Sequence, residues 1–95
     1  PITSIGDQAF YNRTSLTSVT IPESVSSIGS GAFESCTSLA SINIPDSVSI
    51  IRRSVFYNCP SLSSIMIPDG VTSIGVGAFG FCSSLTNISG DEPII

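Results

Sequence analysis

Residues 16–38 read LTSVTIPESVSSIGSGAFESCTS, and the same pattern returns at residues 39–61 and again at 62–84. The three copies keep a period of 23 residues without insertion or deletion. Residues 2–15 continue the same register toward the N-terminus as a partial copy. Self-similarity at a fixed period of this size is typical of a solenoid, in which each repeat forms one coil that stacks on its neighbours. The repeat therefore predicts the architecture of the whole chain.

The repeat also divides the chain into coils. Ninety-five residues allow one domain. We expect a partial coil at 1–15, full coils at 16–38, 39–61 and 62–84, and a broken last coil at 85–95, because the pattern fails after Ile88. The sequence starts at Pro1 without an initiator methionine. We therefore interpret residues 1–95 as a single repeat domain cut from a longer array.

Each full unit carries the signals of two extended stretches and one compact turn. Val19 and Ile21 alternate with small polar residues, as in a strand with one buried face. Pro22 ends that strand because it cannot donate to a ladder, and a second extended stretch runs to Ile28. Two glycines then bend the chain into a segment spaced like a short helical or 3₁₀ turn. The eight side chains expected to point inward in this unit are Leu16, Val19, Ile21, Val25, Ile28, Ala32, Phe33 and Cys36.

Two positions depart from the pattern. The stretch Arg52-Arg53-Ser54-Val55 replaces the Gly-x-Gly-Ala of its neighbours, so the bend there must form without glycine. Arg13 takes the cysteine position of the partial coil, where a buried charge would be costly unless it were paired or reached solvent. We expect both sites to differ locally from the other coils.

The repeat pattern, L-x-x-I-x-I-P-x-x-V-x-x-I-G-x-x-A-F-x-x-C-x-x, resembles the BspA-like (Treponema-type) leucine-rich repeat of surface proteins. The resemblance implies a β-rich leucine-rich-repeat solenoid. It would be a curved right-handed coil, with a parallel sheet on the concave side and short helical or 3₁₀ turns on the convex side. It also implies a location at the cell surface or outside the cell, in proteins associated with adhesion.

Composition and charge exclude several function classes. Seven acidic against three basic residues give a formal net charge of −4, which argues against a nucleic-acid partner. No apolar run approaches the roughly 20 residues that a membrane span needs, and no basic amphipathic stretch is present, so we expect no direct membrane insertion. The chain lacks histidine and lysine, so its serines have no usual base to activate them. We expect no enzyme activity and no cofactor.

Three motifs have a functional and a structural interpretation. The run Gly75-Val-Gly77-Ala-Phe-Gly80 matches a dinucleotide-binding motif, but it occupies the bend of the repeat and lacks the strand–helix context of such sites. Three cysteines share one column, and we interpret them as small buried thiols rather than a disulfide or a metal site. Three acids share another column, where a solvated rim is favoured over a bridging divalent cation. The cysteine column consists of Cys36, Cys59 and Cys82. The acidic column consists of Glu23, Asp46 and Asp69.

Two minor surface features remain open. Asn12 and Asn87 each begin an N-glycosylation sequon, and whether either is used does not follow from the sequence. Arg52, Arg53 and Tyr57 either form a small contact patch on the convex side or are simply solvated.

The candidate binding site lies on the face of the first strand of each coil. In a stack of coils, the outward residues of this strand form two columns of small uncharged side chains. They are Ser18, Ser41, Ser64 and Asn87, and Thr20, Asn43, Met66 and Ser89. Such a surface suits weak, extended hydrogen bonding to a protein segment or a glycan. The sequence therefore predicts a binding module of a cell-surface or secreted adhesin, whose partner is a host or matrix protein or a glycan.

Two alternatives concern assembly. The chain could be a structural spacer or a self-associating array without a specific ligand. Neither end carries a polar cap, so we also expect copies to associate end to end through the apolar residues there. These residues are Ile2, Ile5 and Phe10 at one end and Leu85, Ile88, Ile94 and Ile95 at the other.

Overall fold

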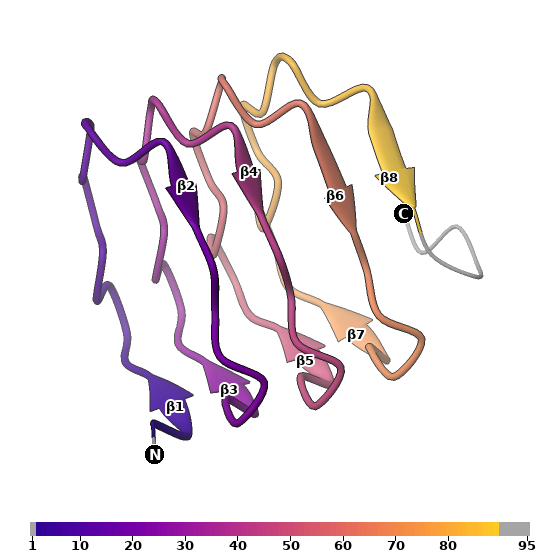
Figure 1. Cartoon of the computed structure of the whole chain (residues 1–95). Coiled ribbons are helices and arrows are strands. Elements are labelled where there is room, and N and C mark those ends of the chain that lie inside the picture. The colour runs from indigo at the N-terminus through magenta and orange to yellow at the C-terminus, as the bar shows by residue number, and fades with distance from the viewer. Residues whose placement is uncertain (1, 90–95) are drawn as a thin grey trace.

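The chain winds into a stack of coils, and each full coil contributes one short strand to each of two strips (Figure 1). The computed structural model describes residues 2–89 and the side chains of residues 2–86. We call residues 2–15 coil 1, 16–38 coil 2, 39–61 coil 3, 62–84 coil 4, and 85–89 the start of coil 5. The apolar residues Ile94 and Ile95 lie outside the described residues, and so does the rest of the broken last coil.

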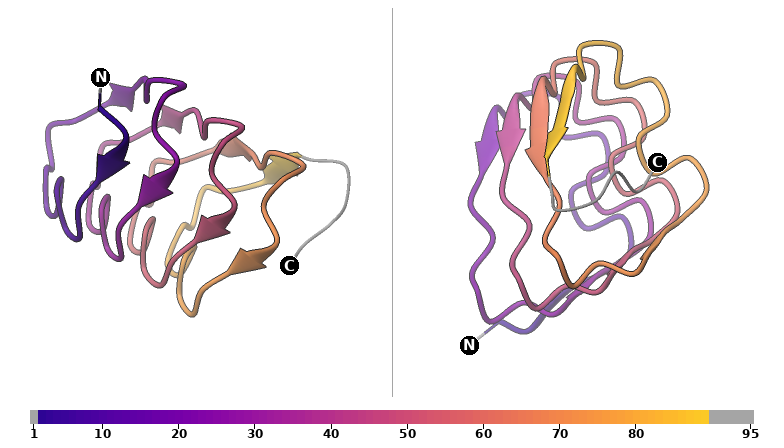
Figure 2. Two further views of the ribbon diagram at one scale, coloured as in Figure 1. Left: turned by 90° about the horizontal axis from the view of Figure 1, so that it is seen from below. Right: turned by 90° about the vertical axis from the view of Figure 1, so that its right-hand side faces the viewer.

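The two strips run along the stack as parallel rows of arrows (Figures 1 and 2). The first strip contains β2 (Ser18–Val19), β4 (Ser41–Ile42), β6 (Ser64–Met66) and β8 (Asn87–Ser89). The second strip contains β1 (Ser4–Ile5), β3 (Ser27–Ile28), β5 (Ile50–Ile51) and β7 (Ser73–Ile74). The strands are only two or three residues long, because Pro22 and its equivalents end the first and the glycine bend ends the second.

Parallel strand pairing alternates between the strips from one junction to the next. β1 pairs with β3 between coils 1 and 2, and β2 pairs with β4 between coils 2 and 3. β5 then pairs with β7, and β6 pairs with β8. Within residues 2–89, therefore, each junction has a strand ladder in one strip only, and the expected continuous sheet is divided into four two-stranded pieces.

A column of turns supplies the continuous connection between coils. It consists of residues 7–12, 30–35, 53–58 and 76–81, and we call it the turn column. At each of the three junctions between coils 1 and 4, three backbone N–H groups of the earlier coil donate to carbonyls of the later coil. At the first junction Gln8, Phe10 and Asn12 donate to Ser30, Ala32 and Glu34, at N···O distances of 2.8–3.0 Å. Beside the strips the direction is reversed, as in the bond from the Ala40 N–H to the Thr17 carbonyl.

The turn column corrects one expectation about the convex side. Among residues 2–89 it contains neither a helix nor a 3₁₀ turn. Bonds between residues three apart, such as Ala9 N–H to Gly6 carbonyl, close successive β-turns instead. Each of the four segments of the turn column has two residues with a left-handed backbone, which no α-helix or 3₁₀-helix accommodates. These residues have φ of 54–70° and are Gln8, Asn12, Gly31, Ser35, Ser54, Asn58, Gly77 and Phe81.

The apolar core lies inside the coils and confirms the inward pattern of the repeat. All eight inward positions of coil 3 are buried: Leu39, Ile42, Ile44, Val48, Ile51, Val55, Phe56 and Cys59. In coil 2 the first two of these positions, Leu16 and Val19, are half-buried. A stack of near-parallel phenylalanine rings passes through the core with centroids 5.2–5.8 Å apart. Its members are Phe10, Phe33, Phe56 and Phe79.

Both departures from the repeat are accommodated locally. Ser54 takes the place of the bend glycine with φ of 60°, close to the 65° and 70° of Gly31 and Gly77. Arg13 is exposed, so its charge stays in water and carries no burial cost.

In the described part of the chain, no helix has the length and apolar character that crossing a membrane requires.

Candidate functional site

The outward serines of the first strip form the most regular polar surface of the coils. Ser18 lies beside Ser41 in the β2–β4 ladder, and Ser64 lies beside Asn87 in the β6–β8 ladder. The side chains of Ser18, Ser41 and Ser64 are all exposed. The strip thus presents one hydroxyl at the same place on each of three successive coils.

The second column of the strip is less uniform than the sequence suggested. Thr20 is exposed, and Met66 is 68% exposed, which leaves its thioether in solvent. Ser89 lies beside Met66 in the β6–β8 ladder. The side chains of Asn87 and Ser89 lie outside the described residues. The structure therefore does not bear on the glycosylation of Asn87.

Asn43 holds the backbone of the preceding coil instead of facing solvent. Its Oδ1 accepts a hydrogen bond from the Ile21 N–H at 2.7 Å, and its Nδ2 donates to the Ile21 carbonyl at 3.0 Å. The side chain thereby extends the β2–β4 ladder by one step, and it is half-buried. Both polar ends of the amide are occupied, so Asn43 contributes little to an outward binding surface.

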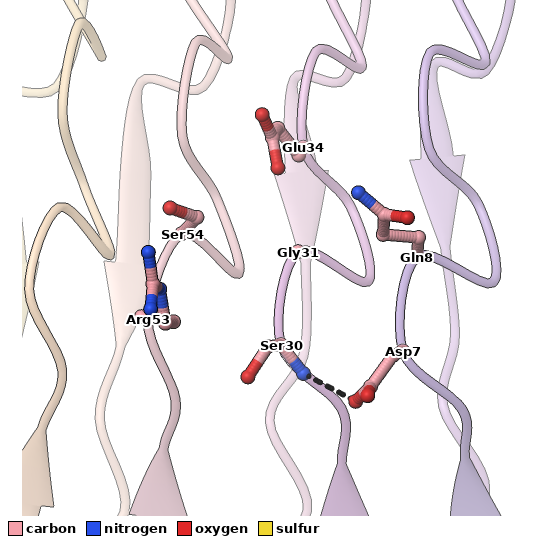
Figure 3. Close-up of a pocket in the computed structure, with 7 residues that line it drawn as sticks. All are labelled: Asp7, Gln8, Ser30, Gly31, Glu34, Arg53 and Ser54. Atoms are coloured by element: carbon pink, nitrogen blue, oxygen red, sulfur yellow. Dashed lines mark hydrogen bonds between the residues drawn. The ribbon is translucent and has the colours of Figure 1, made fainter.

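A polar hollow lies over the turn column, and sequence reasoning did not predict it. It has a volume of about 520 Å³ and opens between coils 1, 2 and 3. Figure 3 shows its lining residues, Asp7, Gln8, Ser30, Gly31, Glu34, Arg53 and Ser54. The Asp7 Oδ1 accepts a hydrogen bond from the Ser30 N–H at 2.9 Å, so one of its two acids is already engaged. No sequence motif marks the hollow, because its residues come from three different coils.

Exposed apolar side chains interrupt the polar surface of coil 4. Phe81 is 71% exposed and packs edge-on against Tyr57 of coil 3, with ring centroids 5.4 Å apart. Val76, at the start of the same turn, is 87% exposed. Phe81 occupies the column that holds Asn12, Ser35 and Asn58 in the other coils. An aromatic residue in this otherwise polar column was the sequence signal for an exposed apolar patch on coil 4.

The three cysteines form a ladder of buried or half-buried free thiols. Each thiol donates to the phenylalanine carbonyl of the preceding coil, and the S···O distances are 3.1–3.2 Å. Burial raises the pKa of the Cys59 thiol from 9.0 to about 12, with repulsion from Cys82 as the second cause. Burial also raises the pKa of Cys36 and Cys82. Thiols held in this neutral form are poor nucleophiles and poor metal ligands.

The acidic column does not gather into a metal centre. Glu23 and Asp46 are exposed at the corners after Pro22 and Pro45. Over residues 2–89, no group of three or more cysteine, aspartate or glutamate side chains is arranged to hold a metal ion.

The family model for the BspA type leucine-rich repeat region (6 copies) matches residues 3–94. The chain belongs to the BspA-type leucine-rich repeat family. Leucine-rich repeats of this kind are binding and scaffold folds. This membership and the parallel strips together confirm the predicted β-rich leucine-rich-repeat solenoid.

Solved structures of bacterial proteins share the BspA-type fold of this chain. A leucine-rich cell surface protein from Faecalibacterium prausnitzii is 32% identical over 97% of this chain, with a TM-score of 0.83. A leucine-rich repeat protein from Bacteroides ovatus is 39% identical over 93% of the chain, with a TM-score of 0.72. The T. pallidum leucine-rich repeat protein is 33% identical over 93%, with a TM-score of 0.77.

The BspA-type repeats described above correspond to only part of these proteins. The chain spans 30% of the F. prausnitzii protein, 29% of the B. ovatus protein and 52% of the T. pallidum protein. No curated protein matches the chain.

Proposed function

We propose that this chain is a protein- or glycan-binding repeat module of a cell-surface or secreted adhesin, and that it binds through the first strip. The observation that carries the proposal is the column of exposed serines at the same place in three successive coils, Ser18, Ser41 and Ser64. The name of the F. prausnitzii relative, a leucine-rich cell surface protein, supports the location.

The chemistry of the strip favours weak contacts that add up along the stack. Its outward side chains lack the tryptophan, tyrosine and arginine anchors that dominate tight interfaces. Each of coils 2, 3 and 4 offers a serine hydroxyl that can both donate and accept hydrogen bonds. A ligand with its own repeating polar groups would engage several coils together, so the strength of binding grows with the number of coils.

The test compares this chain with a longer array of the same coils. Both are passed over immobilised extracellular-matrix proteins and a glycan panel, and binding is followed by surface plasmon resonance. We expect saturable binding that strengthens with coil number and is lost in the Ser41→Arg/Ser64→Arg variant. Ser47→Arg is the matched control, because Ser47 is exposed at a corner outside both strips. Asn43 is left unchanged, since its substitution would disturb the Ile21 backbone.

A structural spacer is the alternative function, and the turn column favours it. Three backbone hydrogen bonds at each of three junctions and an unbroken phenylalanine stack make a continuous support with no need of a ligand. Absence of saturable binding by either array would favour the spacer. Binding that persists in the Ser41→Arg/Ser64→Arg variant would contradict the assignment to the first strip.

A further inference from the structure

Directly after β5 of the second strip, the chain carries a pair of arginines where coils 2 and 4 carry glycine followed by serine or valine. Two of the three basic residues of the chain, Arg52 and Arg53, are adjacent and exposed. The position of Arg52 is glycine in coils 1, 2 and 4. The net charge of the chain is −4, so this pair is a local concentration of positive charge on an acidic molecule.

The glycine column is closely packed, which makes an arginine there unusual. A Cβ added at Gly29 would lie 2.4 Å from the Asp7 nitrogen, and one added at Gly75 would lie 2.5 Å from the Arg53 nitrogen. Arg52 accordingly stands at the junction where the second strip is interrupted, between β3 and β5. Its side chain is exposed and adds nothing to the core. The arginine therefore has no evident role in folding.

The arginine backbone is nevertheless held on both sides. The Gly75 N–H donates to the Ile51 carbonyl at 2.7 Å, and the Gly31 N–H donates to the Arg53 carbonyl at 3.0 Å. Coils 2 and 4 thus fix the chain just before and just after the pair. Fixed attachment points reduce the ordering cost when both side chains close on one ligand.

A hollow of about 310 Å³ lies beside the pair. Gly75 leaves it open, because a side chain there would stand directly over the Arg52–Arg53 peptide. The exposed fraction of Ile50 is 40%, so the hollow has an apolar side as well as a cationic one. Its lining residues are Ser30, Ile50, Ile51, Arg52, Arg53, Ser73, Ile74 and Gly75.

We propose that Arg52, Arg53 and this hollow bind an acidic segment of a partner protein, in which a glutamate or aspartate lies next to an aliphatic residue. Guanidinium groups bind carboxylates through paired hydrogen bonds in a fixed fork. Ile50 receives the neighbouring aliphatic side chain, and the Ser30 and Ser73 hydroxyls flank the carboxylate. The apolar side of the hollow favours a peptide over a sulfated glycan, which has no aliphatic group to place there. This surface is separate from the first strip.

The test titrates the chain with a short synthetic peptide of alternating glutamate and leucine, followed by NMR chemical shifts. We expect saturable shifts at Ile50, Arg53 and Ser73 that weaken with added salt. Arg52→Gly/Arg53→Ser restores the residues found in coil 2, so it keeps the fold, and it should weaken binding about tenfold or more. Arg13→Gln is the control for loss of an arginine elsewhere, because it removes one exposed positive charge from coil 1 and should bind like the parent chain.

Three results would overturn the proposal. The first is binding of the matching glutamine–leucine peptide with equal affinity, which would remove the carboxylate from the recognition. The second is unchanged binding by the Arg52→Gly/Arg53→Ser variant. The third is failure of the acidic peptide to bind while a heparin fragment shifts the same resonances, which would assign the pair to a sulfated glycan. Ser41→Arg/Ser64→Arg should leave these shifts unchanged, so failure here is distinct from failure of the first strip.

Discussion

The turn column and the strand strips connect the same coils in different ways. The turn column repeats three backbone hydrogen bonds at each of the three junctions between coils 1 and 4, whereas each strip has a ladder at alternate junctions only. The phenylalanine stack and the cysteine thiols also lie along the turn side. The comparison teaches that the sheet is the discontinuous part of this solenoid. The turns form the continuous spine.

The largest expected effect comes from breaking the spine at its centre. Phe56 is fully buried between Phe33 and Phe79, so Phe56→Ala should lower the free energy of unfolding by about 3–5 kcal/mol. Val19→Ala in the first strip should cost only about 1 kcal/mol, because Val19 is half-buried. Urea unfolding of both variants measures the difference. A Val19→Ala cost equal to that of Phe56→Ala would contradict the comparison.

The next effect tests the close approach of coils beside the bend. Gly75→Ala places a Cβ 2.5 Å from the Arg53 nitrogen, so it should cost about 1–3 kcal/mol through overpacking. Gly6→Ala meets no atom within 4 Å and should change stability by less than about 0.5 kcal/mol. Thermal unfolding followed by circular dichroism compares the two. Equal shifts in melting temperature for Gly75→Ala and Gly6→Ala would mean that coils 3 and 4 can move apart at Gly75 without loss of stability.

A smaller effect is expected where a side chain completes the first strip. Asn43→Ala removes both bonds to Ile21 and should cost about 1 kcal/mol, because water can reach the half-buried site. Thr20→Ala, in the same column but exposed, should stay within about 0.5 kcal/mol. Hydrogen exchange at the Ile21 amide gives an independent measurement, and it should accelerate in Asn43→Ala alone. An unchanged exchange rate would show that the amide is protected by other means.

The last prediction concerns the buried thiols, which should make the stability of the fold depend on pH only in alkaline solution. The folded-state pKa of Cys59 is raised to about 12 from 9.0, so folding favours the protonated form. This contribution to stability is complete below pH 9 and is lost as the pH rises from 9 toward 12. Melting temperatures measured across that range should fall less steeply in Cys59→Ala than in the parent chain. Parallel curves for the two proteins would refute the assignment to this thiol.

Local periodicity was enough to predict the coil and its inward side chains, and the resemblance of the repeat pattern to a known repeat predicted its family. These features depend on which residues are apolar, and Phe33, Phe56 and Phe79 recur at the same place in each unit. The β-turns were not predictable in the same way, because Gln8, Ser35 and Phe81 adopt left-handed backbones that their side chains do not favour. Gly31, Gly77, Asn12 and Asn58 are of residue types that favour that conformation.

The candidate site was predictable at the level of columns but not of individual side chains. Thr20, Asn43 and Met66 occupy one column, yet only Asn43 turns to the backbone of the preceding coil. That choice depends on the distance between neighbouring coils, which a sequence does not contain. The hollows beside Arg53 were missed for the same reason, since each combines residues of three coils.

The direction of the turn-column bonds has a consequence for assembly. Every coil aims its turn N–H groups at the following coil and its turn carbonyls at the preceding one. Along the turn column, the two faces of a run of coils are therefore chemically different, one presenting donors and the other acceptors, while the bonds beside the strips run the opposite way. Turn segments that met through identical faces would oppose donor to donor or acceptor to acceptor, so the bonding of the turn column is specific for one direction of stacking. The turn column thus gives the stack a direction along its axis, because all nine of its inter-coil bonds point the same way.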